Sequence, residues 1–189
     1  MTRYFYYSNF FAKKKAISQN NFQLYSNKSF QKIKKVQIQV SFKDIFFNID
    51  KYIPYIVYLI EFFSNQKSTY GFSKSDVSFW RLRKKDIVSL FITLRQEPIF
   101  NFIEKFVIFY SPKVLLNDNT IKVICNKNYV TFNITNFQFF NEVNTEIFKI
   151  QESKLKLSKL NIKVIVIFSS IKKKSKLNYL RDFQIPFYF

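Results

Sequence analysis

The sequence predicts an α+β protein in which helices pack on one face of a largely antiparallel sheet. Three observations predict this class. Several runs alternate apolar and polar residues, which is the period of a half-buried strand. Three other segments favour helices, and two of them carry apolar residues at helical spacing. The order is strand, helix, strands, helix, strands, helix, so all the helical stripes can be buried against one side of a sheet.

The first strand and the first helix follow each other directly. In "KVQIQVS", Val36, Ile38 and Val40 alternate with polar residues, as in a strand with a polar outer face. The next segment, "NIDKYIPYIVYLIEFF", is typical of a helix, with Asp50 as a plausible cap and Pro54 about one turn in, where a missing N–H costs least. Its apolar stripe is Ile49, Ile53, Ile56, Ile60 and Phe63.

The stretch "IVSLFITLRQEPIFNFIEKFVIFY", residues 87–110, divides into a strand and a helix and is not a membrane hairpin. Apolar and outward residues alternate from Val88 to Arg95. We expect "QEP" to begin a helix with Pro98 at its first position, and Ser111 and Pro112 to end it. Its inward stripe is Ile99, Phe102, Phe106 and Phe109. No apolar window in the chain reaches the about 18 residues that a spanning helix needs.

The rest of the chain predicts three more strands, a basic helix and an extended end. The strands are "TIKVIC" at 120–125, "YVTFNITNFQFF" at 129–140 and "LNIKVIVIFSS" at 160–170. The helix, "KKKSKLNYLRDF", covers 172–183 and leads into "QIPFYF" at 184–189.

We expect a basic segment at residues 1–28 followed by a single domain at 29–189. A chain of 189 residues fits one domain with a substantial core. No acidic residue precedes Asp44, so the first segment is either a presequence or a basic arm that reaches along RNA. Presequences are usually rich in Arg and Ala, whereas this segment is rich in Lys, Phe, Tyr and Asn, which favours a retained arm.

The charge of the chain predicts a polyanionic partner. Lys and Arg number 31 against 12 Asp and Glu, a net charge of +19 on a chain that is 48% hydrophobic. Nucleic acid and an anionic membrane face are the two candidates. The excess of Phe, Tyr, Ile, Asn and Lys is typical of an A+T-rich genome, such as an organelle's.

We expect no enzyme activity, cofactor, metal or small-molecule substrate. The chain has no histidine, which excludes histidine-based nucleophile systems and histidine metal ligands. Gly71 is the single glycine, so neither a P-loop nor a dinucleotide-binding turn can form. Cys125 is the single cysteine, and we expect it to be a small buried apolar residue.

Two regions are candidates for RNA contact. The outer faces of the predicted strands carry Gln39, Phe91, Thr93 and Arg95, groups suited to bases, riboses and phosphates. The alternative is a solvated sheet face. In "STYGFSKSDVSFWRLRKK", residues 68–85, aromatic and basic residues alternate around the glycine, as in loops that stack on bases and neutralise phosphates. The alternative there is a plain hairpin with a solvated basic tip.

Five segments in order resemble the universal large-subunit ribosomal protein five family, over roughly residues 30–187. "KIKKVQIQV" resembles its first strand, and "FFSNQKSTYGFSKSDVSFWRLRKKD" resembles its Gly-Gln-Lys-Pro turn and long basic loop. "IVSLFITLRQEPIFNFIEKFV" resembles its strand ending Val-Thr-Leu-Arg-Gly and the next helix. "KNYVTFNITNFQFFNEV" and "LNIKVIVIFSSIKKKSKLNYLRDFQIPF" resemble its Gly-Asn-Tyr strand and its final strand, helix and Pro-Phe ending.

The resemblance implies a structural protein of the central protuberance of the large ribosomal subunit. Together with the A+T-rich composition, it leads us to expect a mitochondrial, organelle-encoded member. Its partners would be rRNA (5S, 23S-like or both), P-site transfer RNA, a small-subunit head protein and other central-protuberance proteins. The implied rRNA-binding residues are Gln39, Gln66, Thr93, Lys34 and Lys35. The implied transfer-RNA loop contributes Lys74, Trp80, Arg81 and Arg83, and the implied small-subunit bridge contributes Lys113 and Asn117.

The chain departs from the family pattern at two places. The glycine after Thr-Leu-Arg is Gln96 here, and an Arg-rich stretch after the second long helix is "VLLNDN". These departures bear on the 5S rRNA contact and on the bridge. The rival interpretation is a membrane-peripheral basic subunit of an organellar complex, which would use aromatic helices and Lys patches on anionic lipid.

Overall fold

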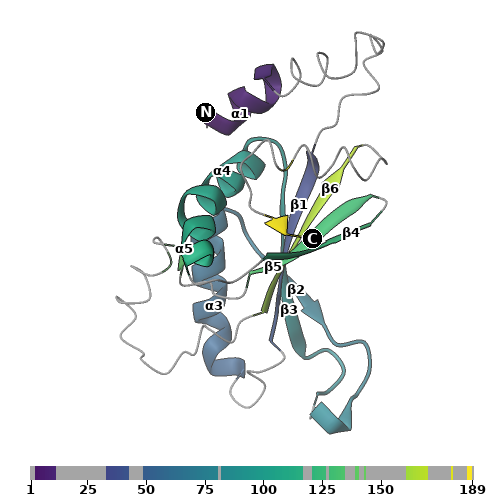
Figure 1. The fold of residues 1–189 in the computed structure, drawn as a ribbon. Coiled ribbons are helices and arrows are strands. Elements are labelled where there is room, and N and C mark those ends of the chain that lie inside the picture. Colours follow the sequence, from purple (N-terminus) through teal and green to yellow (C-terminus); the bar gives the residue numbers. More distant parts are fainter. Residues whose placement is uncertain are drawn as a thin grey trace. The chain divides into compact units, whose positions relative to one another are not determined.

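The computed structural model describes residues 3–11, 33–42, 49–80, 82–116, 121–126, 128–134, 139–140, 143, 161–169, 180 and 187–188 (Figure 1). The chain forms two compact units, and each is described by itself. The first consists of Met1–Val36, Arg95–Phe132 and Ile165–Phe189. The second consists of Gln37–Leu94 and Asn133–Val164.

The predicted fold class is confirmed: the protein is α+β with a largely antiparallel sheet. The strands of the described residues follow the order β2-β3-β1-β6-β5-β4-β7. They are β1 (Ile33–Ser41), β2 (Thr69–Phe72), β3 (Ile87–Leu94), β4 (Ile121–Cys125), β5 (Tyr129–Ile134), β6 (Asn161–Phe168) and β7 (Phe187–Tyr188). β2 pairs antiparallel with β3, and β4 pairs antiparallel with β5, while the two-residue β7 lies parallel to β4.

The helical elements include two π turns and one short 3₁₀ turn. They are α1 (Arg3–Tyr6), η1 (Tyr7–Phe11), α3 (Ile49–Ser64), η3 (Ser78–Trp80), α4 (Glu97–Lys105), η4 (Phe106–Tyr110) and α5 (Ser111–Leu116). No helix in the described part of the chain combines the length and the apolar character needed to cross a bilayer.

In the second unit, α3 supplies the helical layer against the hairpin strands, as the apolar periodicity predicts. On the part of β1 in this unit, Ile38 and Val40 are buried, and Gln37 and Gln39 are half-buried. Val36, the last β1 residue of the first unit, is buried as well. The buried residues of α3 are Ile53, Ile56, Leu59, Ile60 and Phe63. Leu59 is an addition to the predicted stripe, and Ile49 and Asp50 have side chains outside the described set. Phe63 packs against Phe140, with ring centroids 4.5 Å apart.

In the first unit, the helix after β3 is longer than predicted. Gln96 precedes it, and Pro98 is its second residue, not its first. The expectation that Ser111 and Pro112 end the helix is wrong, because α4, η4 and α5 follow one another without a break to Leu116. The N–H of Ser111 bonds to the carbonyl of Phe106, five residues back, in the π pattern. Pro112 has no N–H to donate to a helical hydrogen bond. It is tolerated here because the preceding turn has π and not α hydrogen bonding.

The π turn also changes which aromatic residue faces the core. Phe109 was expected inside, but it is only half-buried, whereas Tyr110 is buried. A π turn closes its hydrogen bond one residue later than an α turn, so the inward position moves on by one residue. Phe106 therefore stacks on Tyr110, with centroids 4.9 Å apart, and meets Phe132 of β5 at 5.1 Å.

The later predictions hold in part. β4, β5 and β6 occupy the expected runs, but β5 ends at Ile134, and Phe139 and Phe140 lie outside any strand. Of the predicted basic helix at 172–183, only Leu180 is described, and it is helical and buried. Cys125 is half-buried and not fully buried as expected, since β4 is followed at its outer side only by the short β7.

Candidate nucleic-acid interface

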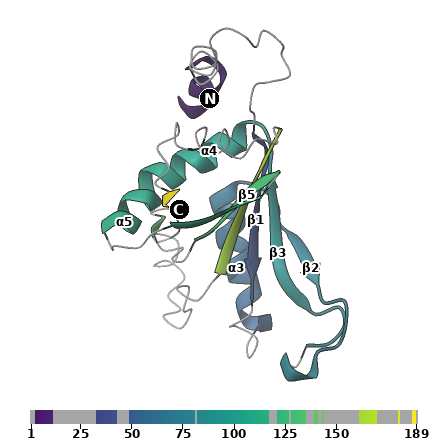
Figure 2. The same cartoon turned by 45° about the vertical axis from the view of Figure 1, so that its right-hand side comes forward.

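The β2–β3 hairpin carries most of the described residues that sequence reasoning assigned to RNA. Thr69, Tyr70 and Gly71 pair with Phe91, Leu90 and Ser89, and a bulge follows between Gly71 and Phe72. Figure 2 shows the connecting loop extending past the end of α3. The loop has a defined conformation, because backbone hydrogen bonds join its two sides at two levels.

The two levels are short antiparallel contacts within the loop. At its base, the Ser73 N–H donates to the Asp86 carbonyl at 2.8 Å, and the Lys85 N–H donates to the Ser73 carbonyl at 3.1 Å. Nearer the tip, Val77 and Leu82 exchange two backbone bonds of 3.0 and 3.1 Å. Leu82 is buried, so the tip has a small apolar anchor of its own.

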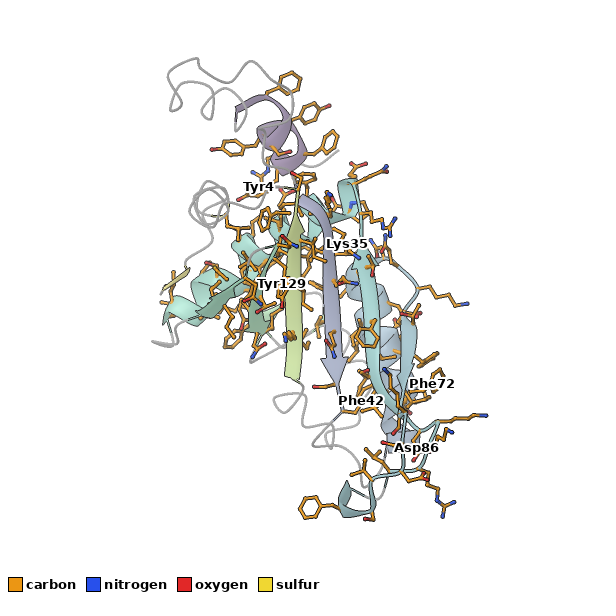
Figure 3. All side chains as sticks on the ribbon, turned by 90° about the vertical axis from the view of Figure 1, so that its right-hand side faces the viewer. Tyr4, Lys35, Phe42, Phe72, Asp86 and Tyr129 are labelled. Atoms are coloured by element: carbon orange, nitrogen blue, oxygen red, sulfur yellow. The ribbon has the colours of Figure 1, made fainter. Side chains whose placement is uncertain are left out.

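The carboxylates of this loop are used to hold its backbone. Asp76 Oδ1 accepts the N–H of Lys84 at 2.6 Å, and Asp86 Oδ2 accepts the N–H of Arg83 at 2.7 Å. Figure 3 shows Asp86 at the base of the loop, below Phe72. Each carboxylate thus stabilises the turn that presents the basic side chains, with the shorter bonds that charged acceptors form.

The described cations of the loop point to solvent. Lys74, Arg83, Lys84 and Lys85 are all exposed, and within the described part of the chain none of them lies in an ion pair. Phe79, in η3 at the tip, is 88% exposed. An exposed ring among unpaired cations can stack on a base and neutralise phosphates together. Trp80 ends η3, but its side chain and Arg81 lie outside the described residues.

The polar face of the sheet brings together some of the assigned residues. By strand alternation, Gln39 lies on the outer face of β1 and Thr93 on the outer face of neighbouring β3, and both are half-buried. Lys35 occupies an odd-numbered position of β1, as Gln39 does, and is also half-buried, but it belongs to the first unit. Lys34 alternates with them and so belongs to the opposite side of the strand, although it is exposed at the strand's start. Gln39 and Thr93 therefore form the centre of this face, and Lys34 does not join it.

Gln66 lies in the turn that joins α3 to β2. Its N–H donates to Ser64 Oγ at 3.4 Å, and the Ser64 hydroxyl donates to the Gln66 carbonyl at 3.3 Å. One turn earlier, Glu61 Oε1 accepts both the N–H and the hydroxyl of Ser68, each at 2.7 Å. These two bonds lower the pKa of Glu61 below its ordinary value. The turn is thus fixed by a charged acceptor, which sets where β2 begins.

Sequence reasoning left the role of Phe91 open and did not foresee its contact with the single glycine. A Cβ placed on Gly71 would lie 2.5 Å from Cε2 of Phe91 and would also collide with the Ser89 hydroxyl. The ring therefore occupies the space that any other residue at 71 would need. The Thr69 hydroxyl donates to the Phe91 carbonyl at 3.0 Å and holds this pair of strands in register.

The N-terminal segment was expected to be a basic arm or a presequence, and its described part is a helix packed on α4. Arg3 Nε lies 3.0 Å from Glu104 Oε1, and the Phe5 ring meets Phe100 edge-on at 5.6 Å. Burial and the Glu104 charge raise the pKa of Tyr4. For the predicted bridge, Lys113 is half-buried on α5, and Asn117 lies outside the described residues.

Comparison with models of known protein families and with curated proteins found no match to this chain.

Proposed function

We propose that the chain is a non-enzymatic RNA-binding protein of the large ribosomal subunit, built into the central protuberance. The observation that carries the proposal is the loop of the β2–β3 hairpin. Its carboxylates accept backbone N–H groups, and its cations stay exposed and unpaired among the described residues. Such an arrangement favours a phosphate backbone, because each neutralised phosphate releases counterions.

The resemblance to the ribosomal protein five family supports the same function. In that family's pattern, the loop would reach P-site transfer RNA, and the sheet face with Gln39 and Thr93 would meet rRNA, 5S or 23S-like. Lys113 and Asn117 would belong to the contact with a small-subunit head protein. The mitochondrial matrix is the proposed location.

The backbone at Gln96 is a second support. The resemblance places a glycine here, and Gln96 has φ 56° and ψ −126°. This region is nearly restricted to glycine, because a Cβ crowds the neighbouring carbonyl. A turn shaped for glycine at this position is what the family pattern predicts, even though the chain carries glutamine.

Sedimentation of native particles tests the proposal against the membrane-peripheral rival. Lysate from cells that express the tagged chain is run on a sucrose gradient, and a parallel sample is floated with its membranes. We expect the chain to migrate with large ribosomal subunits and to shift to the top of the gradient after ribonuclease treatment. Recovery only with floating membranes, unaffected by ribonuclease, would establish the rival.

A further inference from the structure

Among the described residues on the outer sheet face of the second unit, Phe91 is an aromatic ring with mostly polar neighbours. Phe91 is half-buried on β3, and the outward positions around it are Gln39 and Ser41 on β1 and Ser89 and Thr93 on β3. The apolar residues of the same strands, such as Leu90 and Ile92, are buried on the other side. Core burial therefore does not account for a phenylalanine at this position.

The ring is confined beside the chain's single glycine. Phe91 and Gly71 are diagonal neighbours on paired strands, a separation that aromatic side chains can span. A Cβ built on Gly71 would lie 2.5 Å from Cε2 of Phe91 and closer still to Oγ of Ser89, so an edge carbon of the ring fills the space that a side chain at position 71 would need. Because this edge of the ring is confined beside Gly71, its freedom to change rotamer is limited. A fixed ring loses little entropy when a second flat group is placed on it.

We infer that Phe91, confined beside Gly71, is a platform on which an unpaired nucleobase of the bound RNA stacks. This rests on the proposed function. Bases that are not paired stack readily on aromatic side chains, and their edges are read by hydroxyl and amide groups, which Thr93 and Gln39 supply beside the ring.

The basic residues of the same hairpin support RNA as the molecule that binds on Phe91. β3 rises about 3.4 Å per residue, so its first residue, Ile87, lies about 14 Å from Phe91. Just beyond it come the exposed Lys85, Lys84 and Arg83. A single strand whose base rests on Phe91 can therefore keep its phosphates within reach of the loop. The loop would supply the salt-dependent attraction, and the platform would supply a contact that salt does not screen.

The experiment uses the full chain and an oligoadenosine of about 16 nucleotides with 2-aminopurine at one position. The emission of 2-aminopurine falls when it stacks, and anisotropy gives the affinity at several salt concentrations. We expect quenching on binding by the wild-type chain. Phe91→Leu should weaken binding about 5- to 100-fold with the same salt slope and should abolish the quenching. Phe91→Tyr keeps a stacking ring, so its affinity should stay within about threefold of the wild-type value and the quenching should be retained.

Two further variants separate stacking from a structural role. Phe62→Leu removes an exposed ring on α3 of the same unit and should change neither affinity nor quenching. Gly71→Ala should displace the Phe91 ring, and the double variant Gly71→Ala/Phe91→Leu should bind no worse than Phe91→Leu alone. Thermal unfolding of each variant confirms that it is folded.

Failure of the platform and failure of the proposed function give different results. Wild-type binding without quenching, or equal affinity of a folded Phe91→Leu variant, overturns the platform and leaves salt-dependent RNA binding in place. No binding by the wild-type chain, together with its absence from ribosomal subunits, overturns the proposed function and the platform with it.

Discussion

The hairpin loop and the N-terminal helix both contain aromatic and basic residues, but they use charge in opposite ways. Both combine aromatic and basic residues, as in "RYFYYSNFF" and "SKSDVSFWRLRKK". In the N-terminal helix, Arg3 is paired with Glu104 and Phe5 packs on Phe100. In the loop, Asp76 and Asp86 accept backbone N–H groups, and the cations are left exposed. The loop also has more basic residues, and the position of its carboxylates leaves the described ones without an ion-pair partner and available to a polyanion.

The largest expected effect is a loss of stability when an aromatic residue of the first unit's core is removed. Phe106→Ala removes a ring that is 1% exposed and that packs on both Tyr110 and Phe132, so it should lower the free energy of unfolding by about 3–5 kcal/mol. Tyr110→Ala should cost a similar amount, while Phe109→Ala should cost less than about half as much, since Phe109 is only half-buried. Urea unfolding measures all three. A larger loss at Phe109 than at Tyr110 would contradict the π turn.

The loop cations should carry the salt dependence of RNA binding. Arg83→Ala with Lys84→Ala should reduce the slope of log K against log salt by about 0.7 for each phosphate that the loop no longer neutralises. Arg3→Ala is the matched control, because its guanidinium is already paired with Glu104, and it should leave the slope unchanged. Anisotropy titrations at several salt concentrations measure both. An equal fall in slope for Arg3→Ala would remove the distinction between the two basic segments.

Relief of backbone strain should stabilise the junction between β3 and α4. Gln96→Gly places the residue suited to φ 56° and ψ −126° there, and we expect a gain of about 1–2 kcal/mol in the free energy of unfolding. Gln96→Ala keeps the Cβ and should give no such gain. Thermal and urea unfolding, compared at the same pH, measure the difference. A destabilised Gln96→Gly variant would mean that the glutamine side chain makes a compensating contact.

The turn that leads into the hairpin should make a small contribution to the free energy of unfolding, and this contribution should be lost in acid. The folded-state pKa of Glu61 is lowered by its bonds from Ser68, so this stability is present above the ordinary value of 4.5 and is lost as the pH falls through the lowered pKa. Glu61→Gln keeps an acceptor and removes the titration. Its unfolding free energy should therefore depend less on pH below 4.5 than that of the wild-type chain. Identical pH profiles would rule out this contribution.

Local periodicity was sufficient for most of the fold. The alternation of Val36, Ile38 and Val40 and the spacing of Ile53, Ile56 and Phe63 reflect strand and helix geometry directly, and these residues are buried as expected. The helix boundary at Ser111 and Pro112 was wrong, because a proline is compatible with a helix when a π turn precedes it. That turn depends on packing, which no short sequence window contains.

The composition of the candidate site could be predicted from the sequence, but its hydrogen bonds and side-chain contacts could not. The loop at 68–85 was recognisable from its aromatic and basic residues, but the roles of Asp76 and Asp86 depend on a backbone that the sequence does not specify. The contact between Gly71 and Phe91 depends on strand register, which pairs residues about twenty positions apart. A glycine next to a run of aromatic residues was the available signal, but it does not identify which ring uses it.

The bulge between Gly71 and Phe72 has a consequence for self-association. β2 is the last strand on its side of the described sheet, and it carries exposed Tyr70 and Phe72, so its free edge is a template for pairing with another chain. The strand is only four residues long, the bulge interrupts its regular hydrogen bonding, and exposed lysines stand close to both ends at Lys67 and Lys74. A second copy would bring the same bulge and the same charges. The edge therefore resists aggregation while its aromatic residues stay on the surface.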